Sequence, residues 1–172
     1  MQEYLGAPHS PSRTSEHPLA GAAGYKWDYW QTLESDFALQ GPTAHHLAHK
    51  YGTQAPQVLE LAKSDKSLDL PLVEGEASIR AQVVYAVRHE MARTLEDVLA
   101  RRIGLQLYGW RLAIDAAPVA AALMGQELGW NAEEEQVALE QYVTMVNHRI
   151  TSAGQQPEPV PSVIRELTLE RK

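Results

Sequence analysis

Two pairs of residues that contain histidine have types and spacing that could support chemistry. His89 and Glu90 begin like the zinc-protease motif HExxH, in which two histidines one helical turn apart bind the metal. The motif fails because its last position is Arg93, a cation where a neutral imidazole is needed. His45 and His49 stand at i and i+4 and could face one metal ion, but no HxxE or CxxC supplies a third ligand. A solvated helix face is the favoured interpretation of that pair.

The segment 83–102, VVYAVRHEMARTLEDVLARR, concentrates more charge than any motif considered above. Asp97 and Arg101 stand at i and i+4 in the favourable acid-first order. Glu90 ends the preceding helix and can reach Arg101 or Arg102 if the two helices meet at a corner. The favoured interpretation is an ionic clasp that fixes this angle. A cluster offered to a partner surface or an anionic ligand stays open as the alternative. The predicted cluster consists of Arg88, Glu90, Arg93, Asp97, Arg101 and Arg102.

Other catalytic and nucleotide-binding motifs are missing from the sequence. The glycine cluster GAAG at 21–24 lacks both the GxGxxG spacing and the preceding apolar strand of a dinucleotide site. There is no Walker loop, no GxSxG, and no nucleophile beside a matched base. The acidic run 133–135 lies at a predicted helix start, where the helix dipole favours acids in any case. We therefore expect no catalytic, cofactor-binding or metal-binding residue in this chain.

Composition narrows the class of protein further. The 172 residues carry a formal net charge of -7, which opposes binding to nucleic acid, including by a helix-turn-helix over 78–103. The chain has no cysteine, so disulfides and thiolate chemistry are excluded. No apolar run is long enough to span a membrane, and the N-terminus lacks the layout of a secretory signal. These features are compatible with a cytoplasmic location.

Hydrophobic spacing predicts an all-α protein, an orthogonal bundle of six or seven short helices. Residues 1–24 are rich in Pro, Gly, Ser and Ala and are interpreted as a linker or arm. Residues 25–150 form the predicted helical domain. Residues 151–172 form a Pro-rich tail with a short helix expected from Ser162.

Particular residues are expected to start the helices. The first predicted helix begins at Tyr25, and later ones begin at Ser78 and Asp115. Two capping pairs are also expected, Thr94 with Asp97 and Asn131 with Glu134.

The charged segment 83–102 also carries a family resemblance. It closely resembles the signature region of the C-terminal helical domain of FAD-dependent glycerol-3-phosphate dehydrogenases. PLAGAAGY at 18–25, AHHLAHKYG at 44–52 and LMGQELGW at 123–130 resemble further parts of that domain in the same order. The likeness spans about residues 18–148. Two departures are Gln82, where family members often have Glu, and IGLQLYGW after the double arginine.

The resemblance implies a role as one part of a larger enzyme. In that family a large N-terminal portion binds FAD, oxidises sn-glycerol 3-phosphate to dihydroxyacetone phosphate and passes electrons to a quinone-type acceptor. The helical domain packs on that portion and supports it. The expected partner is therefore the N-terminal flavin-binding portion, and the chain alone is expected to be inactive and to hold no FAD.

Several further points follow from the resemblance or compete with it. The resemblance leaves room for a homo-oligomer and for a peripheral contact of the full-length enzyme with the inner face of the membrane. An apolar patch is expected where the missing portion would pack, with Trp27, Trp30 and Trp110 as its candidates. The rival hypothesis is a free-standing helical protein-interaction module.

Overall fold

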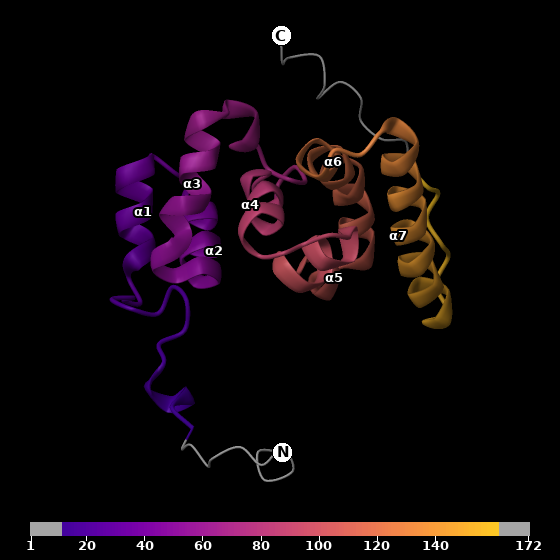
Figure 1. The fold of residues 1–172 in the computed structure, drawn as a ribbon. Coiled ribbons are helices and arrows are strands. Elements are labelled where there is room, and N and C mark those ends of the chain that lie inside the picture. Colours follow the sequence, from indigo (N-terminus) through magenta and orange to yellow (C-terminus); the bar gives the residue numbers. More distant parts are fainter. Residues whose placement is uncertain (1–11, 162–172) are drawn as a thin grey trace, which may run out of the picture.

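The computed structural model describes residues 12–161, which form helices joined by short turns (Figure 1). In chain order the α-helices are α1 (Tyr29–Phe37), α2 (Gly41–Tyr51), α3 (Ala55–Ser64), α4 (Ala81–His89), α5 (Leu105–Tyr108), α6 (Trp110–Leu128) and α7 (Ala132–Ser152). The shorter turns are the 3-10 helices η2 (Thr14–Glu16), η3 (Gly52–Gln54) and η4 (Lys66–Leu68), and the π-helix η5 (Asp97–Arg102). Within the described residues, strand-like pairing is limited to a single bridge between Pro71 and Ile79. The all-α prediction is confirmed.

Helix α6 forms the centre of the molecule. It packs against α4 on one side and α7 on the other, and α1, α2 and α3 lie together beyond α4 (Figure 1). Several of its core positions are alanines with no exposed surface, which let the neighbouring helices approach closely. These residues are Ala113, Ala116, Ala117, Ala120 and Ala121. Most of the surface of α6 is buried against neighbouring helices, which include α4 and α5. Helix α6 therefore holds the corner between α4 and α5 in place.

The N-terminal arm joins the bundle at one backbone contact. The Thr53 N–H donates to the Gly21 carbonyl over 2.9 Å, and Gly21 packs directly on Tyr51 and Gly52. Both glycines have positive φ, 79° and 54°, and a Cβ on either would collide with the backbone of the other segment. The arm is therefore fixed against the C-terminal end of α2.

Three helices begin elsewhere than the sequence predicted. Helix α4 begins at Ala81 because Ser78 is engaged in an extended turn, where its carbonyl accepts from the Leu72 N–H. Helix α6 begins at Trp110, directly after the extended Gly109, so Asp115 lies inside the helix. Helix α1 begins at Tyr29 because the residues after Tyr25 form turns.

Both predicted capping pairs are confirmed. The Asn131 side chain accepts from the Glu134 N–H while Glu134 accepts from the Asn131 N–H, which starts α7. Thr94 and Asp97 exchange the same kind of reciprocal hydrogen bonds, at 3.0 and 3.1 Å. After α7 the chain turns back along it, and Glu158 pairs with Asn147 through two hydrogen bonds. The helix predicted from Ser162 lies outside the described residues.

Candidate functional site at the corner between α4 and α5

The corner begins where α4 ends in a tight left-handed turn. The N–H groups of Glu90 and Ala92 both donate to the Ala86 carbonyl, at 3.1 and 3.0 Å. Between them Met91 adopts φ 58°, a conformation that glycine usually supplies at a helix end. The Arg102 guanidinium then donates two hydrogen bonds, of 3.1 and 2.8 Å, to the Glu90 carbonyl. Arg102 thus fastens the end of α4 to the end of η5.

The π-helix η5 directs its two arginines differently. Ile103 N–H donates to the Val98 carbonyl five residues earlier over 2.7 Å, the spacing of a π-turn. Arg102 turns back to Glu90, whereas Arg101 lies at the surface. Short π-turns are frequent at functional sites, so the corner is a candidate on backbone grounds as well as on charge.

Lys50, Glu90 and Arg102 form what we call the corner cluster. Arg102 Nε lies 3.9 Å from Glu90 Oε2, an atom that is buried and accepts no hydrogen bond within residues 12–161. Burial raises the pKa of Glu90, and the charges of Arg102 and Lys50 oppose that rise. Although Lys50 lies at the surface, partial loss of water lowers its pKa, with Glu90 opposing and Arg102 adding to the change. The cluster thus holds two cations around one half-buried carboxylate.

A second ionic group forms on the outer side of the corner. Asp97 accepts from the Arg93 and Thr94 N–H groups and from Arg101 Nη1, the last at 2.6 Å. Burial alone would raise the pKa of Asp97, but these hydrogen bonds lower it below its ordinary value. Arg101 also lies 3.2 Å from Glu96. The Arg93 side chain is exposed, so Arg93 contributes to this group through its backbone.

Arg88, the remaining residue of the predicted cluster, points to another helix. Its guanidinium makes a two-pronged pair with Glu127 of α6, at 2.6 and 2.7 Å. The six residues therefore divide among three contacts: Arg88 on α6, Glu90 with Arg102 at the corner, and Arg93, Asp97 and Arg101 on its outer side. Sequence reasoning missed Glu127 because 39 residues separate it from Arg88.

Gln82 organises a buried polar network behind the corner. This side chain has no exposed surface, and its Oε1 accepts from the Ile79 N–H at 3.0 Å. Its Nε2 donates to Tyr51 Oη at 3.1 Å and lies 3.1 Å from His46 Nε2. Burial lowers the pKa of His46 and nearby Lys50 lowers it further, while Gln82 opposes the change. Since a neutral His46 is favoured in the folded state, its contribution to stability is lost as pH falls below the ordinary histidine range.

Arg101→Ala is expected to leave the melting temperature unchanged within error. The pairs that Arg101 makes with Asp97 and Glu96 are at the surface, where water and salt screen them. Thermal unfolding in low and high salt would check this. A clear loss of thermal stability that added salt does not reduce would show that Arg101 braces the fold.

Met91→Gly is expected to be more stable than Met91→Ala by about 1 kcal/mol, because only the glycine relieves the positive φ. The exposed side chain makes the alanine variant a matched control for lost packing. Urea unfolding of the two variants measures the difference. Equal stabilities would mean that Met91 is not strained.

His45 and His49 lie on an aromatic strip at the surface. The rings of Trp30 and His45 stack at 4.0 Å, those of Trp27 and His49 lie 4.9 Å apart, and the two imidazoles are 5.7 Å apart. Residues 12–161 contain no group of three side chains that could hold a metal ion. Each of the two imidazoles thus packs against an indole ring.

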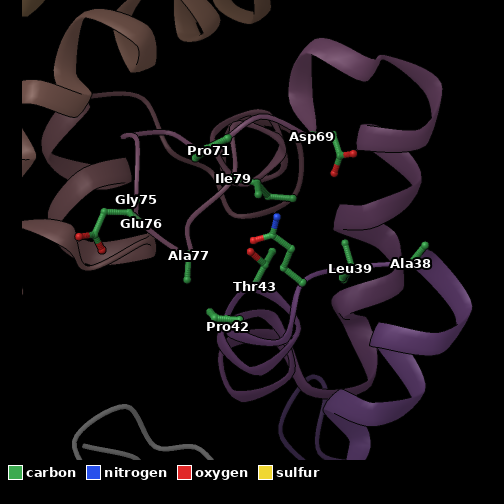
Figure 2. Close-up of a pocket in the computed structure, with 11 residues that line it drawn as sticks. Ala38, Leu39, Pro42, Thr43, Asp69, Pro71, Gly75, Glu76, Ala77 and Ile79 are labelled. Carbon is green, nitrogen blue, oxygen red and sulfur yellow. The ribbon is translucent and has the colours of Figure 1, made fainter.

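A pocket of about 350 Å³ lies away from the corner, between the α1–α2 turn and the segment before α4 (Figure 2). Leu39, Pro42 and Pro71 line it together with the carboxylates Asp69 and Glu76. No residue of the predicted ionic cluster contributes to it. The corner therefore remains the stronger candidate, and its arrangement suits ionic and apolar recognition by another surface.

None of the helices in residues 12–161 combines the length and apolar character needed to cross a membrane.

Comparison with known protein families shows which family this chain belongs to. Residues 12–135 match the family described as the C-terminal domain of alpha-glycerophosphate oxidase. The chain belongs to this family. The match includes the whole corner, from the end of α2 through α5, and confirms the resemblance carried by residues 83–102.

Relatives of this C-terminal domain include glycerol-3-phosphate dehydrogenases from bacteria and eukaryotes. Glycerol-3-phosphate dehydrogenase 2 of Mycobacterium tuberculosis is 30% identical over 173 residues, covering 99% of this chain and 29% of the relative. The probable mitochondrial glycerol-3-phosphate dehydrogenase of Dictyostelium discoideum is 38% identical, covering 73% of this chain and 20% of the relative. The chain thus spans less than a third of the length of the relatives it matches. No solved structure matches it.

Proposed function

We propose that this chain is the C-terminal accessory domain of an FAD-dependent glycerol-3-phosphate dehydrogenase. The observation that carries the proposal is the match of residues 12–135 to the C-terminal domain alone. The relatives that share it are named glycerol-3-phosphate dehydrogenases and are more than three times as long as the chain. The domain supplies a rigid helical surface, and oxidation of sn-glycerol 3-phosphate takes place in the rest of the enzyme.

The described residues do not fit FAD. Gly21, in the one glycine cluster of the sequence, packs on the backbone of Gly52 and so does not form a phosphate cradle. In the full-length enzyme, FAD held by the N-terminal portion would supply the oxidising chemistry. Residues of this chain then act by packing on that portion. For the whole enzyme we propose a cytoplasmic location, at the inner face of the membrane where a quinone acceptor is within reach.

Two experiments test the proposal. The purified chain is expected to show no flavin absorbance after incubation with FAD, and no oxidation of sn-glycerol 3-phosphate. The gene upstream of the Met1 codon is expected to continue in frame into a catalytic coding region with a GxGxxG fingerprint. Tight FAD binding by the chain would count against the proposal, because it would place flavin chemistry in this domain. A stop codon directly upstream would also count against it and would favour the free-standing interaction module.

A further inference from the structure

Large apolar side chains are exposed in two neighbouring places. Among residues 12–161, five such side chains are 77–84% exposed. They are Leu19 and Trp27 of the arm, and Met91, Leu107 and Tyr108 at the corner. Of the three tryptophans proposed for a patch, only Trp27 belongs to this group, because Trp30 and Trp110 pack partly against the core. Exposed apolar groups that gather in one region mark interaction surfaces.

Contacts around the corner place Tyr108 beside the corner cluster, and Met91 and Leu107 adjoin Glu90 and Tyr108 in the sequence. Arg102 holds the carbonyl of Glu90, the residue directly before Met91. A Cβ on the buried Gly104 would lie 3.8 Å from the Tyr108 ring and 3.9 Å from Lys50 Nζ, so Gly104 lies close to both. The corner face, as we use the term, consists of Lys50, Glu90, Met91, Arg102, Leu107 and Tyr108.

The backbone of the corner face gives an independent indication of function. Met91 keeps a left-handed conformation that costs a non-glycine residue about 1–3 kcal/mol, although its side chain is 83% exposed. Packing within residues 12–161 gains little from this side chain. Strained backbone of this kind clusters at functional sites.

The N-terminal arm, which leads into the helical bundle, lies beside the corner face. Gly21 is fixed against Tyr51 and Gly52, the residues directly after Lys50. Trp27 packs on His49, the residue directly before Lys50. In the relatives, the matched region is a C-terminal domain and makes up less than a third of the length. A preceding catalytic portion would therefore enter beside the corner face.

We infer that the corner face docks on the catalytic, flavin-binding portion of the enzyme, an inference that rests on the proposed function. The corner cluster carries one positive charge in excess, since Lys50 and Arg102 surround the single carboxylate of Glu90. The complementary surface is therefore apolar opposite Leu107 and Tyr108, and acidic or rich in carbonyl groups opposite the cations. Docking there buries Met91 and ties the arm between the two portions.

Hydroxyl-radical footprinting tests the inference, because Met, Tyr and Trp side chains are oxidised readily. The oxidation rates of Met91 and Tyr108 are compared between the isolated chain and the native-length protein. In the native-length protein both rates are expected to fall by about fivefold or more, since a packed interface excludes water. Trp130 and Met145, which line a separate pocket with Arg93 and Glu96, serve as controls that keep their rates.

A matched pair of variants adds a second measurement. Leu107→Asp in the native-length protein is expected to return Met91 and Tyr108 toward the rates of the isolated chain. Val137→Asp, a change at an exposed position of α7, is expected to leave them protected. Both variants should leave the melting temperature of the isolated chain unchanged, which separates docking from folding.

The remaining outcomes distinguish the two proposals. Equal oxidation rates in the isolated chain and in a longer, flavin-containing native protein would overturn the docking inference alone. Protection that increases with the concentration of the isolated chain would overturn it in favour of a second copy as the occupant. A native polypeptide no longer than this chain would overturn the proposed function and the docking inference together.

Discussion

Replacing Gln82 with methionine is expected to lower the free energy of unfolding by about 3 kcal/mol, because each buried polar group left unpaired costs about 1–3 kcal/mol. Methionine retains the length of the side chain, so little volume is lost. The Ile79 N–H loses its acceptor and Tyr51 Oη loses its donor, both in a buried environment. Equilibrium unfolding in urea, monitored by circular dichroism, measures the change.

Gln57→Met is the matched control for Gln82→Met. Gln57 is exposed and accepts one hydrogen bond, from Tyr85 at 3.2 Å, so the same substitution there should cost less than about 1 kcal/mol. If the two variants proved equally stable, the buried network would contribute nothing to the fold. The Gln82 network behind α4 would then not be what keeps the corner rigid.

Arg102→Ala is the second large effect, a loss of about 2 kcal/mol at pH 7, because the Glu90 carbonyl loses both guanidinium hydrogen bonds and the carboxylate loses one of its neighbouring cations. Burial already raises the pKa of Glu90, and removal of Arg102 raises it further. In acid the Glu90 side chain is protonated and neutral. The loss of its ion pair with Arg102 then no longer lowers the free energy of unfolding. The destabilisation should therefore be smaller near pH 4 than at pH 7.

Unfolding of Arg102→Ala at the two pH values measures this dependence, with Arg101→Ala as the reference for removing a neighbouring surface arginine. A loss of stability that is the same at both pH values would show that the Glu90 carboxylate does not respond to Arg102. A variant as stable as the unchanged chain would contradict the role of Arg102 as the fastener between α4 and η5.

Local signals in the sequence predicted the parts of the fold that depend on neighbours in the chain. Asn131 with Glu134, and Thr94 with Asp97, were predictable because a capping box is complete within four residues. The start of α4 was not, because Ser78 is held by Leu72 in a turn that hydrophobic spacing does not reveal.

The candidate site was predictable only in part, for the same reason. The charged residues of segment 83–102 could be read directly, but the partner of Arg88 is 39 residues away and that of Gln82 is 31 residues away at Tyr51. The left-handed Met91 carries no sequence signal, since glycine is the residue that normally marks such a position. Hydrophobic spacing also could not predict the exposed group of Met91, Leu107 and Tyr108. These residues form one group only in the folded chain, where η5 joins α4 to α5.

The most direct test of the central claim is an assay of the native protein, captured from its source with an antibody raised against this domain. The account predicts a polypeptide more than three times as long as this chain, with bound flavin, that reduces a quinone-like dye with sn-glycerol 3-phosphate and not with glycerol. A captured protein of this chain's own length, without flavin and without that activity, would contradict it.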